Sequence, residues 1–211
     1  MEVHPSEAML RDLIRHQIKN LFLLEAEEEQ VLLDSLPAAL KRTEFCFAFS
    51  QNKYYRRDGK VFFSIYHSGQ YCVFLYYLAR EIFTETPVQR TLADKVYFLN
   101  KALNGIDLYY EVEMPAVFHL DHPVGTVLGR ASYGEGFTFS QHCTVGNNRD
   151  VFPVLAENVT MYSGSKVLGR SHIGANVEIA ANTMIKDTDI PADSIVFGSS
   201  PHLVIKPKNR S

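Results

Sequence analysis

The stretch LAENVTMYSGSKVLGRSHIGANVEIAANTMI, residues 155–185, decides the fold of this chain. Aliphatic side chains recur in it every six residues, at Leu155, Met161, Val167, Ile173, Ile179 and Ile185. Helices repeat every 3.6 residues and strands every two, so neither element alone explains this interval. The fourth residue after each is small or of modest size: Val159, Ser165, Ser171, Val177 and Thr183. Two inward residues per six, with Gly or Asn in several turns, predict a three-sided parallel β-helix.

The same interval continues towards the N-terminus in two shorter series. One contains Val127, Tyr133, Phe139 and Val145, with Ala131 and Cys143 at the small positions. The other contains Leu108, Met114 and Leu120, with one extra residue before Val127. Strands of an ordinary sandwich would drift in spacing between 8 and 12 residues, so we consider that alternative less consistent with the sequence. Between Val145 and Leu155 there are four residues too many, which predicts a loop leaving the coil.

The first half of the chain has helical periodicity instead. The segment SEAMLRDLIRHQIKNLF begins at Ser6, a suitable N-cap, and has apolar residues on one stripe: Met9, Leu10, Leu13, Ile14, Leu21 and Phe22. Two further helical patterns lie in residues 64–83 and 87–105, the second ending at Gly105. We therefore predict an α + β protein. Its parts are an α-helical domain (1–106), a β-helix (107–205) with a protruding loop near 147–153, and a tail (206–211).

Composition narrows the classes of function. The chain has 211 residues, 46% of them hydrophobic, and a formal net charge of -3. That charge gives no basic footprint for nucleic acid, and no apolar run approaches the roughly 18 residues of a membrane span. The start of the chain lacks the pattern of a secretory signal, so we expect a cytoplasmic protein. The three cysteines are widely spaced and predict buried thiols, and no residue cluster has the spacing of a metal site.

The coil and three of its segments resemble a known family. LDHPVGTVLG (120–129), FSQHCTVGNN (139–148) and the residues after 163 are similar to the left-handed β-helix acyltransferases with hexapeptide repeats. Within them they are closest in pattern to the serine acetyltransferase branch, and the resemblance runs over roughly residues 62–205. It implies transfer of an acetyl group from acetyl-CoA to a hydroxyl. The Leu-Asp-His triplet with its extra residue is the most specific feature.

The resemblance implies a catalytic histidine, which is expected to be His122. A base must remove the hydroxyl proton as oxygen attacks the thioester, and an imidazole with an unperturbed pKa near 6.5 suits that task. The extra residue in the coil lets this side chain face outward. By the same comparison, Asp107 would hold the imidazole, and Asp121 would bind a polar group of the acceptor. A turn or junction carboxylate is the alternative for both aspartates. His142 is a further candidate for lining the site.

The resemblance also implies where acetyl-CoA binds. In the family it lies in a groove between subunits of a trimer, so we expect a homotrimer and leave a dimer of trimers open. Small turn residues let a ligand approach the backbone closely. The expected donor-binding residues are Gly146, Ser163, Gly164, Ala181, Lys206 and Lys208. The two lysines are equally well explained as solvated charges of the tail.

Two departures from the family concern the acceptor. Serine acetyltransferases carry an Arg-His pair before the proline of the loop, whereas this chain has Val151 and Phe152. Arg149 would have to replace the lost charge, and Phe152 suits a sugar ring. The helical-domain aspartate that assists serine binding matches Ser50 here, with Asp58 only nearby.

Three functions therefore remain open from the sequence. We expect an acetyl-CoA-dependent O-acetyltransferase acting on a sugar or polysaccharide precursor. The first alternative is a serine O-acetyltransferase of cysteine biosynthesis. The second is a non-catalytic β-helix that binds or scaffolds, against which the intact pair of Asp107 and His122 argues.

Overall fold

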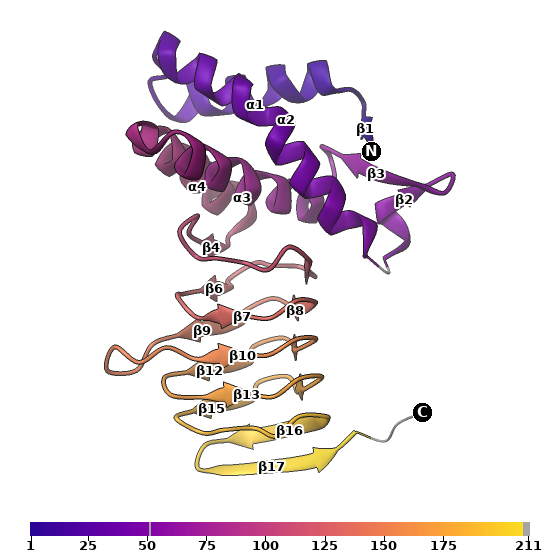
Figure 1. Ribbon diagram of the computed structural model, residues 1–211, viewed down its shortest axis with the longest axis vertical. Coiled ribbons are helices and arrows are strands. Elements are labelled where there is room, and N and C mark those ends of the chain that lie inside the picture. Colours follow the sequence, from indigo (N-terminus) through magenta and orange to yellow (C-terminus); the bar gives the residue numbers. More distant parts are fainter. Residues whose placement is uncertain (51, 209–211) are drawn as a thin grey trace. The chain divides into compact units, whose positions relative to one another are not determined.

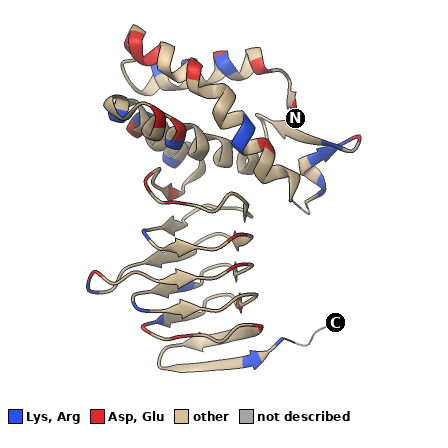
Figure 2. Cartoon of the chain, viewed as in Figure 1, with Lys and Arg blue, Asp and Glu red and all other residues tan. Residues whose placement is uncertain are grey.

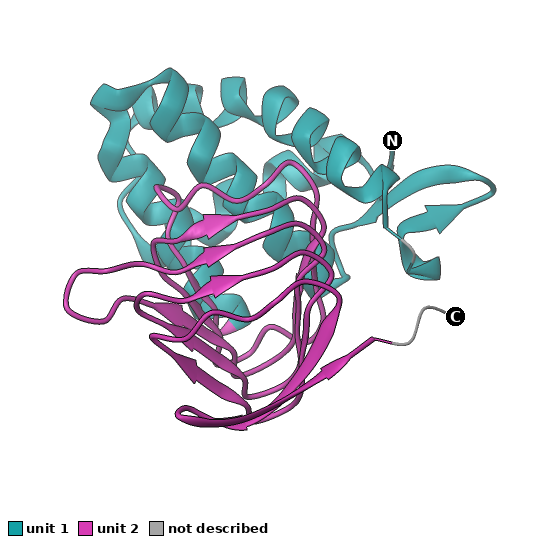
Figure 3. Cartoon of the chain, turned by 60° about the horizontal axis from the view of Figure 1, so that its bottom comes forward, with its two compact units in different colours: residues 1–104 teal, residues 105–211 magenta. Residues whose placement is uncertain are grey.

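The computed structural model describes residues 1–50 and 52–208 and divides the chain into two compact units. Unit 1 comprises Met1–Asn104 and unit 2 comprises Gly105–Ser211 (Figure 3). Unit 1 is mainly helical and unit 2 is built from short strands (Figure 1). In the part of the chain that is described, no helix is long and apolar enough to cross a membrane.

Unit 1 combines helices with a small sheet. Its α-helices are α1 (Glu7–Leu21), α2 (Ala26–Ala48), α3 (Ser68–Glu85) and α4 (Arg90–Asn104), and its 3-10 helices are η1 (Lys53–Tyr55) and η2 (Pro87–Gln89). Its strands β1 (Glu2–His4), β2 (Arg56–Arg57) and β3 (Lys60–Ser64) form a sheet in the order β1-β3-β2. This sheet was not predicted, because its strands are too short to show a period of two.

Helix α1 begins where its N-cap predicts. The Ser6 hydroxyl accepts a hydrogen bond from the Met9 N–H at 3.2 Å. Leu10 and Ile14 of the predicted stripe are buried together with Ile18, whereas Met9 and Leu21 are about half exposed. The buried stripe is therefore narrower than the sequence indicated.

Helix α2 was missing from the prediction although its start carries a signal. The Glu25 N–H donates to the Glu28 side chain at 3.0 Å, which is one half of a capping box. Pro37 lies inside the helix and weakens the sequence pattern. The predicted helices over 64–83 and 87–105 correspond to α3 and α4.

Unit 2 is a parallel β-helix with three flat sides. Side A consists of β4 (Asp107–Leu108), β6 (Val127–Leu128), β9 (Thr144–Gly146), β12 (Lys166–Leu168) and β15 (Met184–Lys186). Side B consists of β7 (Ser132–Tyr133), β10 (Val154–Leu155) and β13 (His172–Ile173). Side C consists of β5 (Phe118–Leu120), β8 (Phe137–Phe139), β11 (Thr160–Met161) and β14 (Glu178–Ile179). Strand β16 (Ser194–Ser199) pairs with both β14 and β15, and β17 (His202–Pro207) returns antiparallel to it.

The register of the coils confirms the hexapeptide reading. Thr160 pairs with Glu178 and Lys166 with Met184, which are 18 residues, or three hexads, further on. Thr144 pairs with Lys166 at a spacing of 22, because the coil between them contains the four extra residues. The fold is thus the expected left-handed parallel β-helix preceded by helices.

The predicted inward residues form the core with two exceptions, Val127 and Ala131. Phe139, Val145 and their successors in the series are at most 2% exposed, and the small positions Ser165, Ser171 and Thr183 are buried with them. Val127, however, is 42% exposed, and its neighbour Leu128 occupies the core position at 2%. The prediction for Val127 was wrong because this coil holds two extra residues before Leu128 and one fewer after it. Ala131 is only partly buried for the same reason.

Three edges join the sides of the coil. The His122 edge contains the turns 121–126, 140–142, 162–164 and 180–182. The loop edge contains residues 130–131, 147–153, 169–171 and 187–189. The third edge is an amide ladder in which Asn158 donates to Asn176 at 3.1 Å and Asn176 donates to Asp193 at 3.0 Å. Figure 2 shows that charged residues of unit 2 lie mainly at its edges.

Candidate active site

The turn that carries His122 protrudes because its coil is longer than the others. Asp107 pairs with Val127 at a spacing of 20 residues, whereas a regular coil has 18. His122 adopts a left-handed backbone conformation, with φ +50°, and its side chain is 82% exposed. The imidazole therefore points away from the core.

Hydrogen bonds attach this turn to the next coil on both sides of the histidine. The Asp121 N–H donates to the Phe139 carbonyl at 2.9 Å. Thr126, which is fully buried, donates through Oγ1 to the Ser140 carbonyl at 2.9 Å and accepts from the Cys143 N–H at 3.2 Å. Sequence reasoning overlooked Thr126, although a hydroxyl within an apolar run was a usable signal. Its two hydrogen bonds tie the turn to the coil below.

The carboxylate of Asp121 lies near the imidazole of His122. Asp121 Oδ1 lies 3.7 Å from His122 Nε2, which is within ion-pair range but too long for a hydrogen bond. Both side chains are largely exposed, and nothing in this turn withdraws them from solvent. The role of Asp121 in binding the acceptor stays a prediction.

Asp107 lies in the coil above the turn. Its N–H donates to the Thr126 carbonyl at 2.8 Å, so its backbone runs beside the end of the His122 turn. Its side chain is half-buried. The pairing of Asp107 with His122 stays a prediction.

His142 lies directly below the turn, on the next coil. Its N–H donates to the Val124 carbonyl at 2.9 Å. A Cβ placed on Gly125 would come within 2.3 Å of His142 Nδ1, and Gly125 has φ +72°. Only glycine leaves room here for the imidazole, so the structure brings His142 to the same edge as His122.

Three of the predicted donor-binding residues continue this edge downwards. The Gly164 N–H donates to the Gln141 carbonyl at 2.9 Å, and the Asn182 N–H donates to the Ser163 carbonyl at 2.9 Å. Ala181 precedes Asn182 and is exposed. Ser163, Gly164 and Ala181 therefore form a column below His142.

The other predicted donor-binding residues lie elsewhere in unit 2. Gly146 is at the far end of β9, where its carbonyl accepts from the Gly169 N–H at 3.0 Å beside the loop edge. Lys206 Nζ lies 5.7 Å from the centre of the Phe197 ring, and the residue before Phe197 accepts from Ala180. Lys206 thus lies over the Phe197 ring on strand β16. Lys208 pairs with Glu178 at 2.7 Å.

The loop 147–153 is a tight hairpin on the opposite side of side A. The Asn148 and Val151 backbones exchange hydrogen bonds of 3.0 and 3.1 Å, and Arg149 and Asp150 between them have φ +52° and +58°. These values define a type I′ turn. Val151 and Phe152 are 42% and 41% exposed. Within one chain, Arg149 and Phe152 lie at the edge opposite His122.

The remaining sequence candidates have structural roles. Asp58, with φ +49°, and Gly59 form the turn between β2 and β3, while the Ser50 hydroxyl accepts from the Asn52 N–H at 3.2 Å. His67 caps α3 by accepting from the Gln70 N–H at 3.2 Å, and burial lowers its pKa. His119 is partly buried, and this burial lowers its pKa.

His172 is exposed and donates through its backbone N–H to the Asp189 side chain at 3.0 Å. Cys46, Cys72 and Cys143 are buried free thiols, and burial raises the pKa of Cys72 to about 12. Among residues 1–50 and 52–208, no group of three or more His, Cys, Asp and Glu side chains is placed to hold a metal ion.

The chain is similar in sequence to serine acetyltransferases. It is 27% identical over 143 residues to the serine acetyltransferase of Staphylococcus xylosus, a match that covers 65% of each chain. With the Staphylococcus aureus protein the identity is 25% over 143 residues, covering 65% of this chain and 66% of the relative. The chain thus spans somewhat less than two thirds of these relatives. No family model matches.

Solved serine acetyltransferases share the fold. The Brucella abortus structure has a TM-score of 0.64 at 18% identity, covering 86% of this chain and 74% of that one. The Neisseria gonorrhoeae structure in complex with serine has a TM-score of 0.65 at 21% identity, covering 86% and 73%. A serine acetyltransferase complex with CoA has a TM-score of 0.65 at 19% identity, covering 85% and 74%. The resemblance noted in the sequence is confirmed.

Proposed function

We propose that this relative of the serine acetyltransferases transfers the acetyl group of acetyl-CoA to the hydroxyl of L-serine. The observation that carries the proposal is the His122 edge. It presents an exposed imidazole in a pinned turn, with His142 below it and the small residues Ser163, Gly164 and Ala181 in line beneath. A base and a run of accessible backbone are what this reaction requires.

In the proposed reaction His122 acts as the general base. Its unprotonated nitrogen takes the hydroxyl proton while the hydroxyl oxygen attacks the thioester carbonyl carbon. The carbon–sulfur bond then breaks, and the imidazolium returns the proton to the departing thiolate. Such a base contributes about 10² to 10⁴ in rate. Asp107 is proposed to orient the imidazole and Asp121 to bind a polar group of the acceptor.

Acetyl-CoA is the proposed donor, and the His122 edge supports this assignment. The turns at Ser163, Gly164 and Ala181 carry small side chains or none, so the donor's amide groups can approach the backbone. Lys206 is the proposed partner for a donor phosphate. Lys208 is a weaker candidate because Glu178 already neutralises it.

Serine is preferred to a sugar as the acceptor. The relatives that match in sequence are serine acetyltransferases, and one of the similar structures holds serine. The sugar or polysaccharide precursor expected from Val151 and Phe152 has no such support. It remains the second candidate, because the exposed Phe152 ring can pack on a pyranose.

A homotrimer is proposed for the active form. Arg149 and Phe152 on the loop edge cannot meet His122 of the same chain across side A. A neighbouring copy that placed its loop edge against the His122 edge would bring Arg149, as a binder of the serine carboxylate, to the base. A dimer of trimers and a cytoplasmic location stay predictions.

The test is an acceptor panel in which thiol release from acetyl-CoA is followed with L-serine, sugars and nucleotide sugars. We expect release with L-serine and a product whose mass is serine plus acetyl. Release only with a sugar would replace serine by the second candidate. No release with any acceptor would leave the non-catalytic scaffold and reject the proposal.

A further inference from the structure

Two turns of the His122 edge are each closed by one backbone hydrogen bond. The Ser165 N–H donates to the Tyr162 carbonyl at 3.1 Å, and the Thr183 N–H donates to the Ala180 carbonyl at 3.2 Å. Each bond joins the first residue of the turn to the buried residue three positions later, just before side A. This bond between residues i and i+3 is the usual closure of a tight turn.

The turn of His142 is closed by a side chain instead. The corresponding groups in this turn are the Ser140 carbonyl and the Cys143 N–H, and both bond to Thr126 in the coil above. Thr126 Oγ1 donates to the carbonyl at 2.9 Å and accepts from the N–H at 3.2 Å. One hydroxyl thus lies between two backbone groups whose equivalents meet directly in the turns below.

The bridge made by Thr126 is buried. Thr126 and Cys143 are both fully buried, and the Val127 N–H donates to the Cys143 carbonyl at 2.9 Å beside them. A buried polar group that lacks a hydrogen-bond partner is costly, so the two backbone groups need either the hydroxyl or each other. An apolar side chain at position 126 would therefore let the Ser140 carbonyl and the Cys143 N–H close on each other.

Such a closure would displace His142, which lies between these two groups in the chain. His142 has φ +59°, and its N–H donates to the Val124 carbonyl at 2.9 Å. Its ring lies so close to Gly125 that a Cβ there would come within 2.3 Å of Nδ1 and 2.8 Å of Cε1. No space remains between the ring and the His122 turn, so a narrower His142 turn must move the ring.

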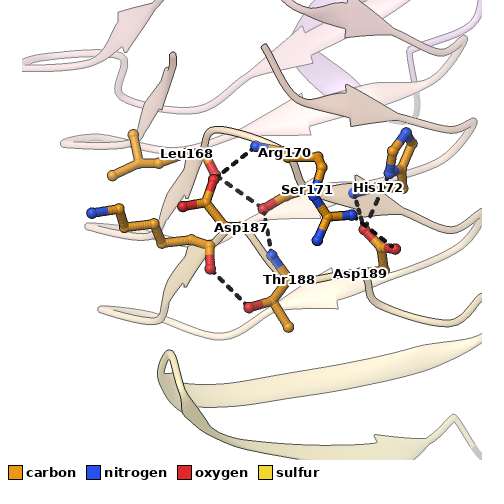
Figure 4. Close-up of polar contacts among 8 residues, drawn as sticks. Leu168, Arg170, Ser171, His172, Asp187, Thr188 and Asp189 are labelled. Carbon is orange, nitrogen blue, oxygen red and sulfur yellow. Dashed lines mark hydrogen bonds and ion pairs between the residues drawn. The ribbon is translucent and has the colours of Figure 1, made fainter. Parts of the chain in front are cut away.

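A second buried hydroxyl, at the loop edge, makes the same number of hydrogen bonds. Ser171 Oγ accepts from the Thr188 N–H at 3.2 Å and donates to the Leu168 carbonyl at 3.0 Å (Figure 4). Those two groups belong to different coils, whereas the groups that Thr126 joins belong to one turn. Ser171 therefore provides a matched control, because it has a similar bonding role on the edge away from His122.

We propose that Thr126 is a positioning residue of the acetyl-transfer site. By bridging the His142 turn, its hydroxyl keeps the His142 imidazole against the His122 turn and beside the acceptor. This inference rests on the proposed function, because the position of His142 affects turnover only if the His122 edge is the active site. The position of the ring itself can be measured without turnover.

The first measurement is therefore independent of activity. The imidazole Cε1–H signals of the full chain, labelled with ¹³C-histidine, are recorded by NMR, and His142→Ala identifies the signal of His142. Thr126→Val removes the hydroxyl and is expected to shift this signal, whereas Thr126→Ser keeps the hydroxyl and the native shift. Thr126→Ala gives the same comparison if the valine variant does not fold. Ser171→Ala should leave the signal unchanged. An unchanged His142 signal without the Thr126 hydroxyl overturns the proposal.

The second measurement is the initial rate of thiol release from acetyl-CoA with L-serine. Thr126→Val is expected to lower kcat/KM by about tenfold or more, because a displacement of about 1 Å at a site can cost about 10²-fold. Thr126→Ser should restore the native value. In a His142→Ala background, Thr126→Val should cost much less, because the hydroxyl acts through that ring. An equal loss in both backgrounds, or a loss no larger than that of Ser171→Ala, indicates a general structural role and overturns the proposal.

The two measurements separate this inference from the proposed function. A shifted His142 signal without turnover of any acceptor by the native chain would reject the acetyl transfer, and with it the catalytic role of Thr126, but not the placement of the ring. Turnover of serine with an unchanged His142 signal in Thr126→Val would uphold the proposed function and reject the positioning role.

Discussion

The His122 edge and the loop edge of the β-helix both stack left-handed turns, since Gly169 and Asp187 of the loop edge also have positive φ and bond to the coil above. The two edges differ in the side chains that join their coils. At the His122 edge the backbone sets the geometry, because Gly125, His142, Gly164 and Asn182 have positive φ in successive coils and bond to the turns above. At the loop edge, side chains such as Asn148 and Asp187 join the coils. The hydrogen bonds at the His122 edge therefore depend mainly on backbone conformation, whereas those at the loop edge also depend on the identity of individual side chains.

The largest expected effect concerns the carboxylates of the two edges. Asp107→Asn is expected to lower kcat/KM for serine by on the order of 10²- to 10⁴-fold, because the imidazole loses the carboxylate that orients it. Asp189→Asn on the loop edge is the control and should leave the rate unchanged. Initial rates of thiol release measure both. Equal rates for Asp107→Asn and the native chain would remove Asp107 from the site.

Alanine substitutions at two glycines compare how strongly the backbone conformation of each edge requires glycine. Gly125→Ala should destabilise unit 2 by about 1–2 kcal/mol through its left-handed conformation alone, and its Cβ would displace the His142 ring. Gly146→Ala is the matched control, since its Cβ would meet only the Leu168 side chain at 3.7 Å. Urea unfolding followed by circular dichroism measures the difference. Similar midpoints for the two variants would contradict the stacking described for the His122 edge.

The loop edge should also contribute a small acid-dependent stability. Hydrogen bonds from the backbone and side chain of His172 hold the pKa of Asp189 below its usual range. A lowered pKa in the folded state means that this stabilisation is present above the unfolded pKa, near 4, and is lost as the pH falls below it. The difference in urea midpoint between the native chain and Asp189→Asn should shrink from pH 6 to pH 3. A constant difference would show that the ionisation of Asp189 does not matter.

The smallest expected effect is in the hairpin of the loop. Asp150→Gly should stabilise the chain by a few tenths of a kcal/mol to about 1 kcal/mol, because glycine fits the second central position of a type I′ turn without strain. Glu157→Gly, at an exposed turn position without positive φ, is the control and should be neutral or destabilising. Thermal unfolding measures both. Destabilisation by Asp150→Gly would argue against the I′ geometry.

The β-helix was predictable because one aliphatic side chain recurs at every sixth position. The six-residue interval from Leu155 to Ile185 predicted the number of residues per coil, and the four extra residues before Leu155 predicted a loop. Leu128 was missed because it follows another aliphatic residue, Val127, and a local change of register cannot be seen when both candidates are apolar. Helix α2 was missed because Pro37 and acidic residues blur its apolar stripe.

The candidate site was only partly predictable. The extra residue near His122 indicated an outward imidazole, and the resemblance supplied the expectation for Asp107. The hydroxyl of Thr126 was visible in the sequence, but the groups that it bridges were not. Only the register of successive coils places it between Ser140 and Cys143.

The central claim is that His122 is the base of an acetyl transfer. Thiol release from acetyl-CoA with L-serine, measured for the native chain, His122→Ala and His172→Ala, tests it most directly. His172 is an exposed histidine of the same β-helix, on side B, and serves as the matched control. The account predicts a loss of about 10²- to 10⁴-fold for His122→Ala and a native rate for His172→Ala. A native rate for His122→Ala would contradict it.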